Sequence, residues 1–169
     1  MLLGRFGETP LPYVVMQIID LIETKESLEQ LAHWHQAEWI HLNPGKTLED
    51  RLEKMQEYLE GKDVPRTFVC KDGETVMGSA AIIESDMETH PELTPWMASV
   101  YVYEDFRKRG IGSELVKKIM DYAKSIGVQT LYLYTEHQEA MYSKLGWERM
   151  SEEEYLGQRV KVMKAELGN

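Results

Sequence analysis

The residue pattern with the clearest chemical meaning lies between positions 100 and 113, where the sequence reads VYVYEDFRKRGIGS. An apolar, β-branched run ends here, basic residues follow, and Gly110 and Gly112 open a helical pattern. Backbone N–H groups at the start of a helix have no partner within the helix, and the helix dipole favours negative charge there. Glycines let a phosphate approach that backbone, and Arg107, Lys108 and Arg109 add positive charge. The segment therefore predicts a site for a diphosphate.

Two other phosphate-binding patterns do not fit the sequence. A dinucleotide fingerprint would need a third glycine where Leu115 stands. A P-loop ending at Gly45-Lys46-Thr47 would need a glycine where Ile40 stands, and no strand pattern leads into it. Taken alone, the segment at 107–112 is also compatible with a basic turn that merely precedes a helix.

The surrounding periodicities predict one domain in which a mixed sheet carries helices on both faces, an α/β or α+β fold. The expected strands are residues 14–22, 66–71, 76–84, 97–103, 128–135 and 160–167, and the expected helices are 27–39, 47–59, 110–125 and 137–145. Capping boxes are expected at Ser27/Gln30 and at Thr47/Asp50. The strand–helix–strand unit around Gly110 requires a parallel strand pair with a right-handed crossover. Residues 1–12 read as a loose arm before a domain at 13–169.

Composition narrows the classes of partner. The net charge of −10 disfavours a nucleic-acid-binding protein and favours cationic small molecules or peptide ends. The single cysteine, Cys70, suits a reducing compartment, and no apolar run is long enough to cross a membrane. We therefore expect a cytoplasmic protein. His33 and His35 point about 200° apart on a helix, so no metal site is expected.

A second motif follows at the distance of one strand. Tyr142-x-x-x-Gly146-Trp147 comes after the strand predicted at 128–135. Together with Arg107-x-x-Gly110-x-Gly112, it resembles the acetyl-CoA-binding core of the GNAT superfamily of N-acetyltransferases, whose pattern is [QR]-x-x-G-x-[GA] with a later tyrosine, glycine and aromatic residue. The resemblance covers about residues 16–166 and includes the order of the elements.

The resemblance implies a V-shaped opening between two splayed parallel strands, here 97–103 and 128–135. It implies backbone hydrogen bonds from Val100, Tyr101 and Val102 to the pantetheine arm and acetyl carbonyl. The pyrophosphate would be wrapped by the loop and helix start, namely Arg107, Lys108, Arg109, Gly110, Ile111, Gly112 and Ser113. Tyr142 matches the tyrosine that protonates the leaving thiolate. Thr135 stands where many members carry a cofactor-contacting asparagine.

The resemblance does not supply the general base, because Trp96 stands where some members carry a glutamate on the central strand. Glu84, at the end of the preceding strand, is predicted to relay the proton through water, and Asp86 is a candidate for the same reason. The predicted activity is direct transfer of an acetyl group from acetyl-CoA to a primary amine of cationic character. The alternative is a non-catalytic acyl-CoA-binding or regulatory domain. Family members pair in several ways, so a homodimer is compatible with the sequence.

Overall fold

The central sheet of the computed structural model, which describes residues 16–168, has seven strands in the order β1-β2-β3-β4-β5-β7-β6. The strands are β1 (Met16–Asp20), β2 (Arg66–Asp72), β3 (Thr75–Ile83), β4 (Trp96–Val102), β5 (Thr130–Thr135), β6 (Glu148–Tyr155) and β7 (Gln158–Glu166). All neighbours are antiparallel except β4 and β5, which are parallel. The predicted mixed sheet is confirmed.

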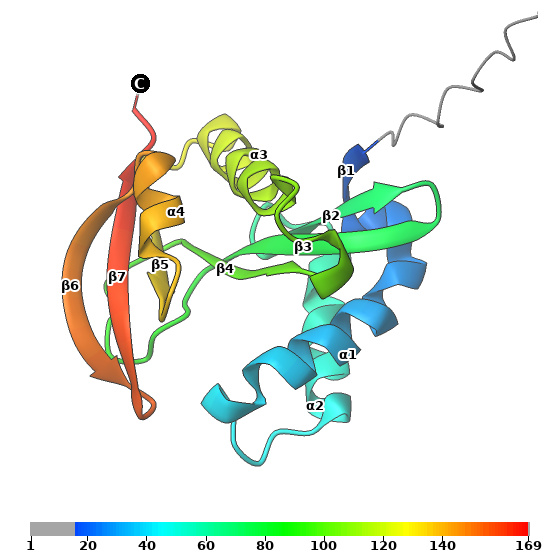
Figure 1. Cartoon of the computed structure of the whole chain (residues 1–169), viewed down its shortest axis with the longest axis horizontal. Coiled ribbons are helices and arrows are strands. Elements are labelled where there is room, and N and C mark those ends of the chain that lie inside the picture. The colour runs from blue at the N-terminus through cyan, green and yellow to red at the C-terminus, as the bar shows by residue number, and fades with distance from the viewer. Residues whose placement is uncertain (1–15, 169) are drawn as a thin grey trace, which may run out of the picture.

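Helices cover both faces of this sheet, as predicted (Figure 1). On one face, α1 (Leu28–Trp39) and α2 (Leu48–Met55) pack Leu28, Leu31 and Met55 against strand residues of β2 and β3. On the other face, α3 (Ile111–Ser125) and the short α4 (Glu139–Lys144) cover a larger cluster that includes β5. No helix within residues 16–168 combines the length and apolar character needed to cross a bilayer.

Helix α3 provides the parallel crossover from β4 to β5, and its position follows from its apolar stripe. Ile111, Leu115, Val116, Ile119 and Ala123 are all buried against the sheet. Burial of each large aliphatic side chain contributes about 1.5–3 kcal/mol, so this stripe fixes the rotation of the helix. The N-terminus of α3 is thereby held at the end of β4.

Strands β4 and β5 diverge after one backbone pairing. Their only register pair is Trp96↔Tyr132, at the start of β4, whereas β4 is paired with β3 up to its last residue, at Gly78↔Val102. The edge of β4 that faces β5 therefore has no strand partner beyond its first residue. Figure 1 shows the consequence: β5, β7 and β6 form one part of the sheet and β1 to β4 the other. This is the predicted splay.

A bulge in β4 lies beside the splay. Between two register pairs, Ser79↔Tyr101 and Ala81↔Ala98, β3 has one residue and β4 has two, and one of these, Ser99, has a φ of 53°. Such a bulge leaves backbone groups outside the ladder and increases the local twist. Gly78 allows the close approach of β3, because a Cβ there would lie 2.4 Å from the Tyr101 carbonyl oxygen. The absence of a side chain at Gly78 therefore permits the local backbone geometry of β4 next to the bulge.

Several local expectations need correction. Strand β6 was not expected from the sequence, because its segment, ERMSEEEY, is largely exposed and rich in glutamate. The capping box expected at Ser27 is wrong: Ser27 makes no cap bond, because a 3-10 helix over Leu21–Ser27 runs directly into α1. The capping box at Thr47 and Asp50 is confirmed. The arm predicted at 1–12 lies outside the described residues.

Candidate functional site

The loop between β4 and α3 forms a backbone cradle at the open end of the splay. A 3-10 turn, Glu104–Phe106, follows β4, and Lys108 and Gly110 then adopt left-handed conformations with φ of 65° and 80°. Gly110 is the N-cap of α3, and its carbonyl accepts the first helical bond from Glu114 N–H at 3.1 Å. The N–H groups of the next three residues are left to bind an external acceptor. The predicted anion site therefore has the expected backbone form.

Gly112 lies where side chains of β4 and α4 approach the start of α3. Its φ is not positive, and a Cβ there would lie 3.8 Å from Val102 Cγ2 and 3.9 Å from the sulfur of Met141. These are ordinary van der Waals distances, so the packing of the fold does not itself require glycine. The added atom would occupy the space between β4 and α4, where the splay opens. The glycine keeps that space clear.

The three basic residues differ in what they contact. Arg107 Nε donates to the Val102 carbonyl at 2.9 Å, and its guanidinium carbon lies 5.9 Å from the centre of the Tyr101 ring. Arg107 therefore ties the loop to β4. The guanidinium of Arg109 lies 5.7 Å from the Phe106 ring centre, and Lys108 is exposed. The charges surround the cradle, and their binding to a cofactor stays a prediction.

Tyr142 of α4 lies on the same side of the sheet as the cradle. Its side chain is 7% exposed, its ring packs edge-on against Trp147, and its N–H donates to Gln138 O. Burial raises the pKa of the phenol to about 12. Within residues 16–168 no group accepts a hydrogen bond from its hydroxyl, so that donor is available for a ligand. Met141, next to it in the chain, is the α4 residue that faces Gly112.

Thr135 ends β5 and already has one bond. Its hydroxyl oxygen accepts from Gln138 N–H at 3.0 Å and so fixes the start of α4. The hydroxyl can still donate its proton, so in the predicted contact Thr135 would be the donor and the cofactor the acceptor. Val100, Tyr101 and Val102 lie on the free edge of β4 at and after the bulge, as the predicted backbone contacts require. The Val102 carbonyl, however, is engaged by Arg107.

On the α1–α2 face, aromatic side chains gather below the same strand. Trp34 and Trp39 of α1 lie 5.6 and 6.0 Å from the Tyr101 ring centre. His35 is buried with its Nε2 3.1 Å from Ser79 Oγ, and burial, with a smaller contribution from Arg51, lowers its pKa to about 3. It is therefore a neutral core residue. Within the described part of the chain no group of three or more His, Cys, Asp or Glu residues could hold a metal ion.

A polar contact links the two parts of the sheet on this face. His41, just after α1, has its Nε2 3.0 Å from Glu136 Oε1, and Glu136 directly follows β5. The Glu136 side chain is 19% exposed and also lies near His137. Neither His41 nor Glu136 would attract attention in the sequence, because the contact joins residues 95 positions apart.

Glu84 and Asp86 follow β3 at the closed end of the splay, since Ile83 pairs with Trp96 while the cradle lies beyond Val102. Glu84 is exposed, and its predicted role in proton relay stays a prediction. Trp96 is fully buried and its indole N–H donates to Leu93 O at 2.7 Å. Burial raises the pKa of Asp86 to about 6, opposed by the charge of Lys54.

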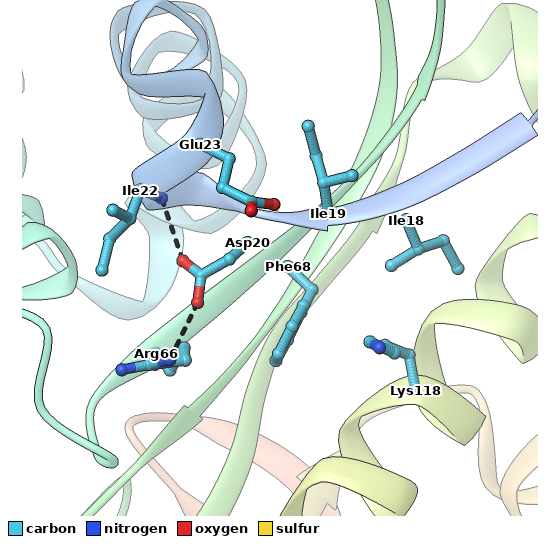
Figure 2. Close-up of a pocket in the computed structure, with 8 residues that line it drawn as sticks. All are labelled: Ile18, Ile19, Asp20, Ile22, Glu23, Arg66, Phe68 and Lys118. Atoms are coloured by element: carbon cyan, nitrogen blue, oxygen red, sulfur yellow. Dashed lines mark hydrogen bonds and ion pairs between the residues drawn. The ribbon is translucent and has the colours of Figure 1, made fainter.

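Two hollows of about 350 Å³ lie away from the splay. The first, between β1, β2 and α3, contains an ion pair between Asp20 and Arg66 at 3.1 Å, with Lys118 on the α3 side (Figure 2). Asp20 also accepts from Ile22 N–H, so its carboxylate is satisfied within the fold. The second lies beside the stacked rings of Trp34 and Tyr103, whose centres are 4.8 Å apart.

Sequence reasoning located the cradle and Tyr142 but missed the features that shape the opening. Gly78 is an isolated glycine within a strand, which is a known signal of a bulge or a close backbone approach. The bulge at Ser99 has no comparable signal, because serine is common in turns and strands alike. The Glu136 contact depends on the tertiary fold and has no sequence signal.

Comparison with known proteins agrees with this geometry. The sequence model of the acetyltransferase (GNAT) family matches residues 28–147. No curated protein matches the sequence. Among solved structures, the fold is similar to yncA from Salmonella typhimurium with its cofactor acetyl-CoA, at a TM-score of 0.70 and 16% identity over 91% of this chain and 95% of that one.

Two further structures show the same fold. A GNAT-family acetyltransferase from Streptococcus pneumoniae has a TM-score of 0.66 and 16% identity, over 90% of this chain and 99% of that chain. Spermidine N-acetyltransferase from Vibrio cholerae, in complex with CoA and spermine, has a TM-score of 0.68 and 14% identity, over 90% and 95% of the two chains.

Proposed function

Because the chain belongs to the GNAT family of acetyltransferases, we propose that it transfers the acetyl group of acetyl-CoA to a primary amine. The observation that carries this proposal is the cradle at Gly110–Gly112, where the first N–H groups of α3 have no partner within the helix and Gly110 has no heavy atom within 4 Å of where a Cβ would stand. Anionic diphosphate groups suit such a site. The splay beyond Trp96 continues from the cradle, so one extended ligand can contact both.

The residues along the splay suit acetyl transfer without a covalent enzyme intermediate. Backbone groups released by the β4 bulge can stabilise the oxyanion that forms at the thioester carbonyl. Tyr142 offers a protonated phenol with no competing partner in residues 16–168, as a general acid for the leaving thiolate requires. Holding the two reactants together at the splay lowers the entropic barrier.

We infer that the amine enters from the α1–α2 face. The opposite face is covered by α3 and α4, whereas here half-buried Tyr101 and Tyr134 flank the splay and the carboxylates of Asp86 and Glu136 lie nearby. Together with the net charge of −10, these carboxylates favour a cationic acceptor. Screening by salt should then raise the acceptor KM.

Cofactor binding can be tested by thermal unfolding with acetyl-CoA. A ligand at 100 times its Kd stabilises the folded state by about 2.7 kcal/mol, which raises the Tm of a domain of this size by about 5–10 °C. Gly112→Asp places a side chain and a negative charge in the cradle and should abolish this rise. Gly73→Asp, which adds the same charge in the β2–β3 turn, should retain it. Equal Tm rises in the parent and Gly112→Asp would move the cofactor site elsewhere.

Turnover requires a separate measurement. Release of free thiol from acetyl-CoA in the presence of a panel of aliphatic amines should be acceptor-dependent. A Tm rise without thiol release would instead support the non-catalytic acyl-CoA-binding alternative.

A further inference from the structure

We propose that Asp86 binds the acceptor as its ammonium ion and takes the proton that must leave before the nitrogen can attack. This inference rests on the proposed acetyl transfer and assigns the general base, which neither the family resemblance nor any bound molecule supplies. It also names the substrate class, a protonated aliphatic primary amine.

The loop holds Asp86 between two fixed points. On its N-terminal side, Ile83 pairs with Trp96 at the one place where β4 also pairs with β5. On its C-terminal side, Met87 is fully buried in a cluster with Trp96, and Glu88 N–H donates to the Tyr155 hydroxyl at 3.3 Å. The carboxylate of Asp86 is therefore held at the closed end of the splay.

The neighbours of Asp86 place it on the acceptor face. The charge of Asp86 acts on two phenols, that of Tyr58, from the 3-10 turn Gln56–Leu59 after α2, and that of Tyr134 of β5, so both lie near it. Burial, and next the negative charge of Asp86, raise the pKa of both phenols, to about 12 for Tyr58. Asp86 thus lies near a residue that follows α2 and near a residue of β5, on the face that carries α1 and α2.

The carboxylate is half-buried and has no hydrogen-bond or ion-pair partner within residues 16–168. Carboxylates that are removed from water without a partner are unusual in folded proteins, because the desolvation cost is not repaid. Burial accordingly raises the pKa of Asp86 from 3.8 to about 6, and Lys54 of α2 is the only charge that opposes this rise. A cationic ligand would supply the missing partner.

Trp96 explains why the base comes from this loop. It occupies the strand position where a carboxylate could have reached the splay, and its only polar group is committed to Leu93 O. Its indole fills the core directly below the loop. Among the carboxylates of this loop, Asp86 is half-buried, whereas Glu84 and Glu88 are exposed.

In the proposed step, Asp86 accepts one proton from the ammonium and Tyr142 donates one to the sulfur. One N–H bond of the ammonium breaks and its proton passes to the Asp86 carboxylate, which leaves a neutral amine. The nitrogen lone pair forms a bond to the thioester carbon, and the C–S bond breaks with its electrons on sulfur. Tyr142 protonates the sulfur, and the second proton of the nitrogen restores the Tyr142 phenol. Asp86 finally releases its proton to solvent, so one proton is produced per acetyl group transferred.

The pH dependence of kcat/KM separates this role from a structural one. With an aliphatic amine, whose pKa is about 10, the kcat/KM of the parent should rise with pH to a plateau above about pH 6. In Asp86→Asn the free amine must bind, so kcat/KM should rise tenfold per pH unit throughout this range. The loss at pH 7 should be about 10²–10⁴-fold, and it should shrink as pH increases.

Other groups that could titrate near neutrality are distinguishable. Tyr58 and Tyr134 stay protonated because their pKa values are raised. His90, in the same loop, has its pKa raised by its 2.7 Å hydrogen bond to Glu153. If the acidic limb of the profile, the rise of kcat/KM with pH, were due to His90, it would remain in Asp86→Asn. Asp86→Glu keeps a carboxylate and should keep the acidic limb.

The controls make each outcome decisive. Glu88→Gln removes an exposed carboxylate two residues away and should behave as the parent. The Tm rise with acetyl-CoA should be the same in the parent and Asp86→Asn, which shows that the variant is folded and that its cofactor site is intact. A parent-like pH profile in Asp86→Asn, or loss of the limb in Glu84→Gln instead, overturns the assignment while acetyl transfer stands. Absence of thiol release in the parent with every amine overturns both.

Discussion

Asp86→Asn should stabilise the protein at neutral pH. The carboxylate is half-buried without a partner in residues 16–168, and burial raises its pKa from 3.8 to about 6. A rise of about 2 in pKa corresponds to about 3 kcal/mol of preference for the neutral form. Because the side chain still has some contact with water, solvent screening reduces this to about 1–2 kcal/mol. Asparagine has the same shape and carries no charge.

The sign of the pH dependence follows from proton binding. Between about pH 4 and 6 the native state binds more protons at this site than the unfolded chain, so the ionisation of Asp86 lowers the free energy of unfolding as pH rises. Below about pH 4 the carboxyl is protonated in both the native and the unfolded state, so burying it does not lower the free energy of unfolding through charge. The advantage of the asparagine variant should therefore be absent near pH 4 and complete above pH 6.

Urea unfolding at about pH 4 and about pH 7.5 measures this difference. At the higher pH the midpoint of Asp86→Asn should correspond to a gain of about 1–2 kcal/mol, or about 3–6 °C in Tm, with no change in m-value. Glu88→Gln should show no such gain. A variant that is less stable than the parent at pH 7.5 would refute the reasoning, because it would mean that the native fold already satisfies the charge.

Three further changes test other parts of the structure. Gly112→Ala should leave the free energy of unfolding unchanged or raise it by up to about 1 kcal/mol through helix propensity, yet weaken acetyl-CoA binding in a titration, since its Cβ enters the cradle. Tyr142→Phe should lower the single-turnover rate about 10²–10⁴-fold at unchanged acetyl-CoA affinity, and a loss below about threefold would remove the phenol from the mechanism. Gly78→Ala should destabilise the fold by about 1–3 kcal/mol in urea unfolding, because its Cβ would lie 2.4 Å from Tyr101 O; an unchanged midpoint would contradict the close approach.

The sequence predicts best where local chemistry and tertiary structure agree. Helix α3 has a full apolar stripe and a glycine at its start; the structure confirms the position of the helix and adds that Gly110 is left-handed. The cradle could be predicted for the same reason. Strand β6 could not, because its exposed glutamates have low strand propensity and only its pairing with β7 makes it a strand. A turn through Leu156 and Gly157, both with positive φ, creates that pairing.

The candidate site divides in the same way. Residues 107–113 and the motif that contains Tyr142 are each a short, continuous stretch of the chain, so both can be recognised in the sequence. The acceptor face is assembled from β3, β4, β5, α1 and the turns after α1 and α2, and its polar contacts, such as His41 with Glu136, join distant positions. Asp86 and Glu84 are both carboxylates just after β3 and differ in burial, which is a property of the folded chain.

The single backbone pair between β4 and β5 has a mechanical consequence. Along most of their length the two parts of the sheet are coupled through side chains and the α3 crossover, and a shear between them breaks few hydrogen bonds. A molecule that forms hydrogen bonds to the edges of both β4 and β5 takes the place of the missing backbone pairing between them. Its affinity and the rigidity of the sheet are then linked quantities, so amide exchange at Val100 and Val102 should slow in proportion to how tightly such a molecule is bound.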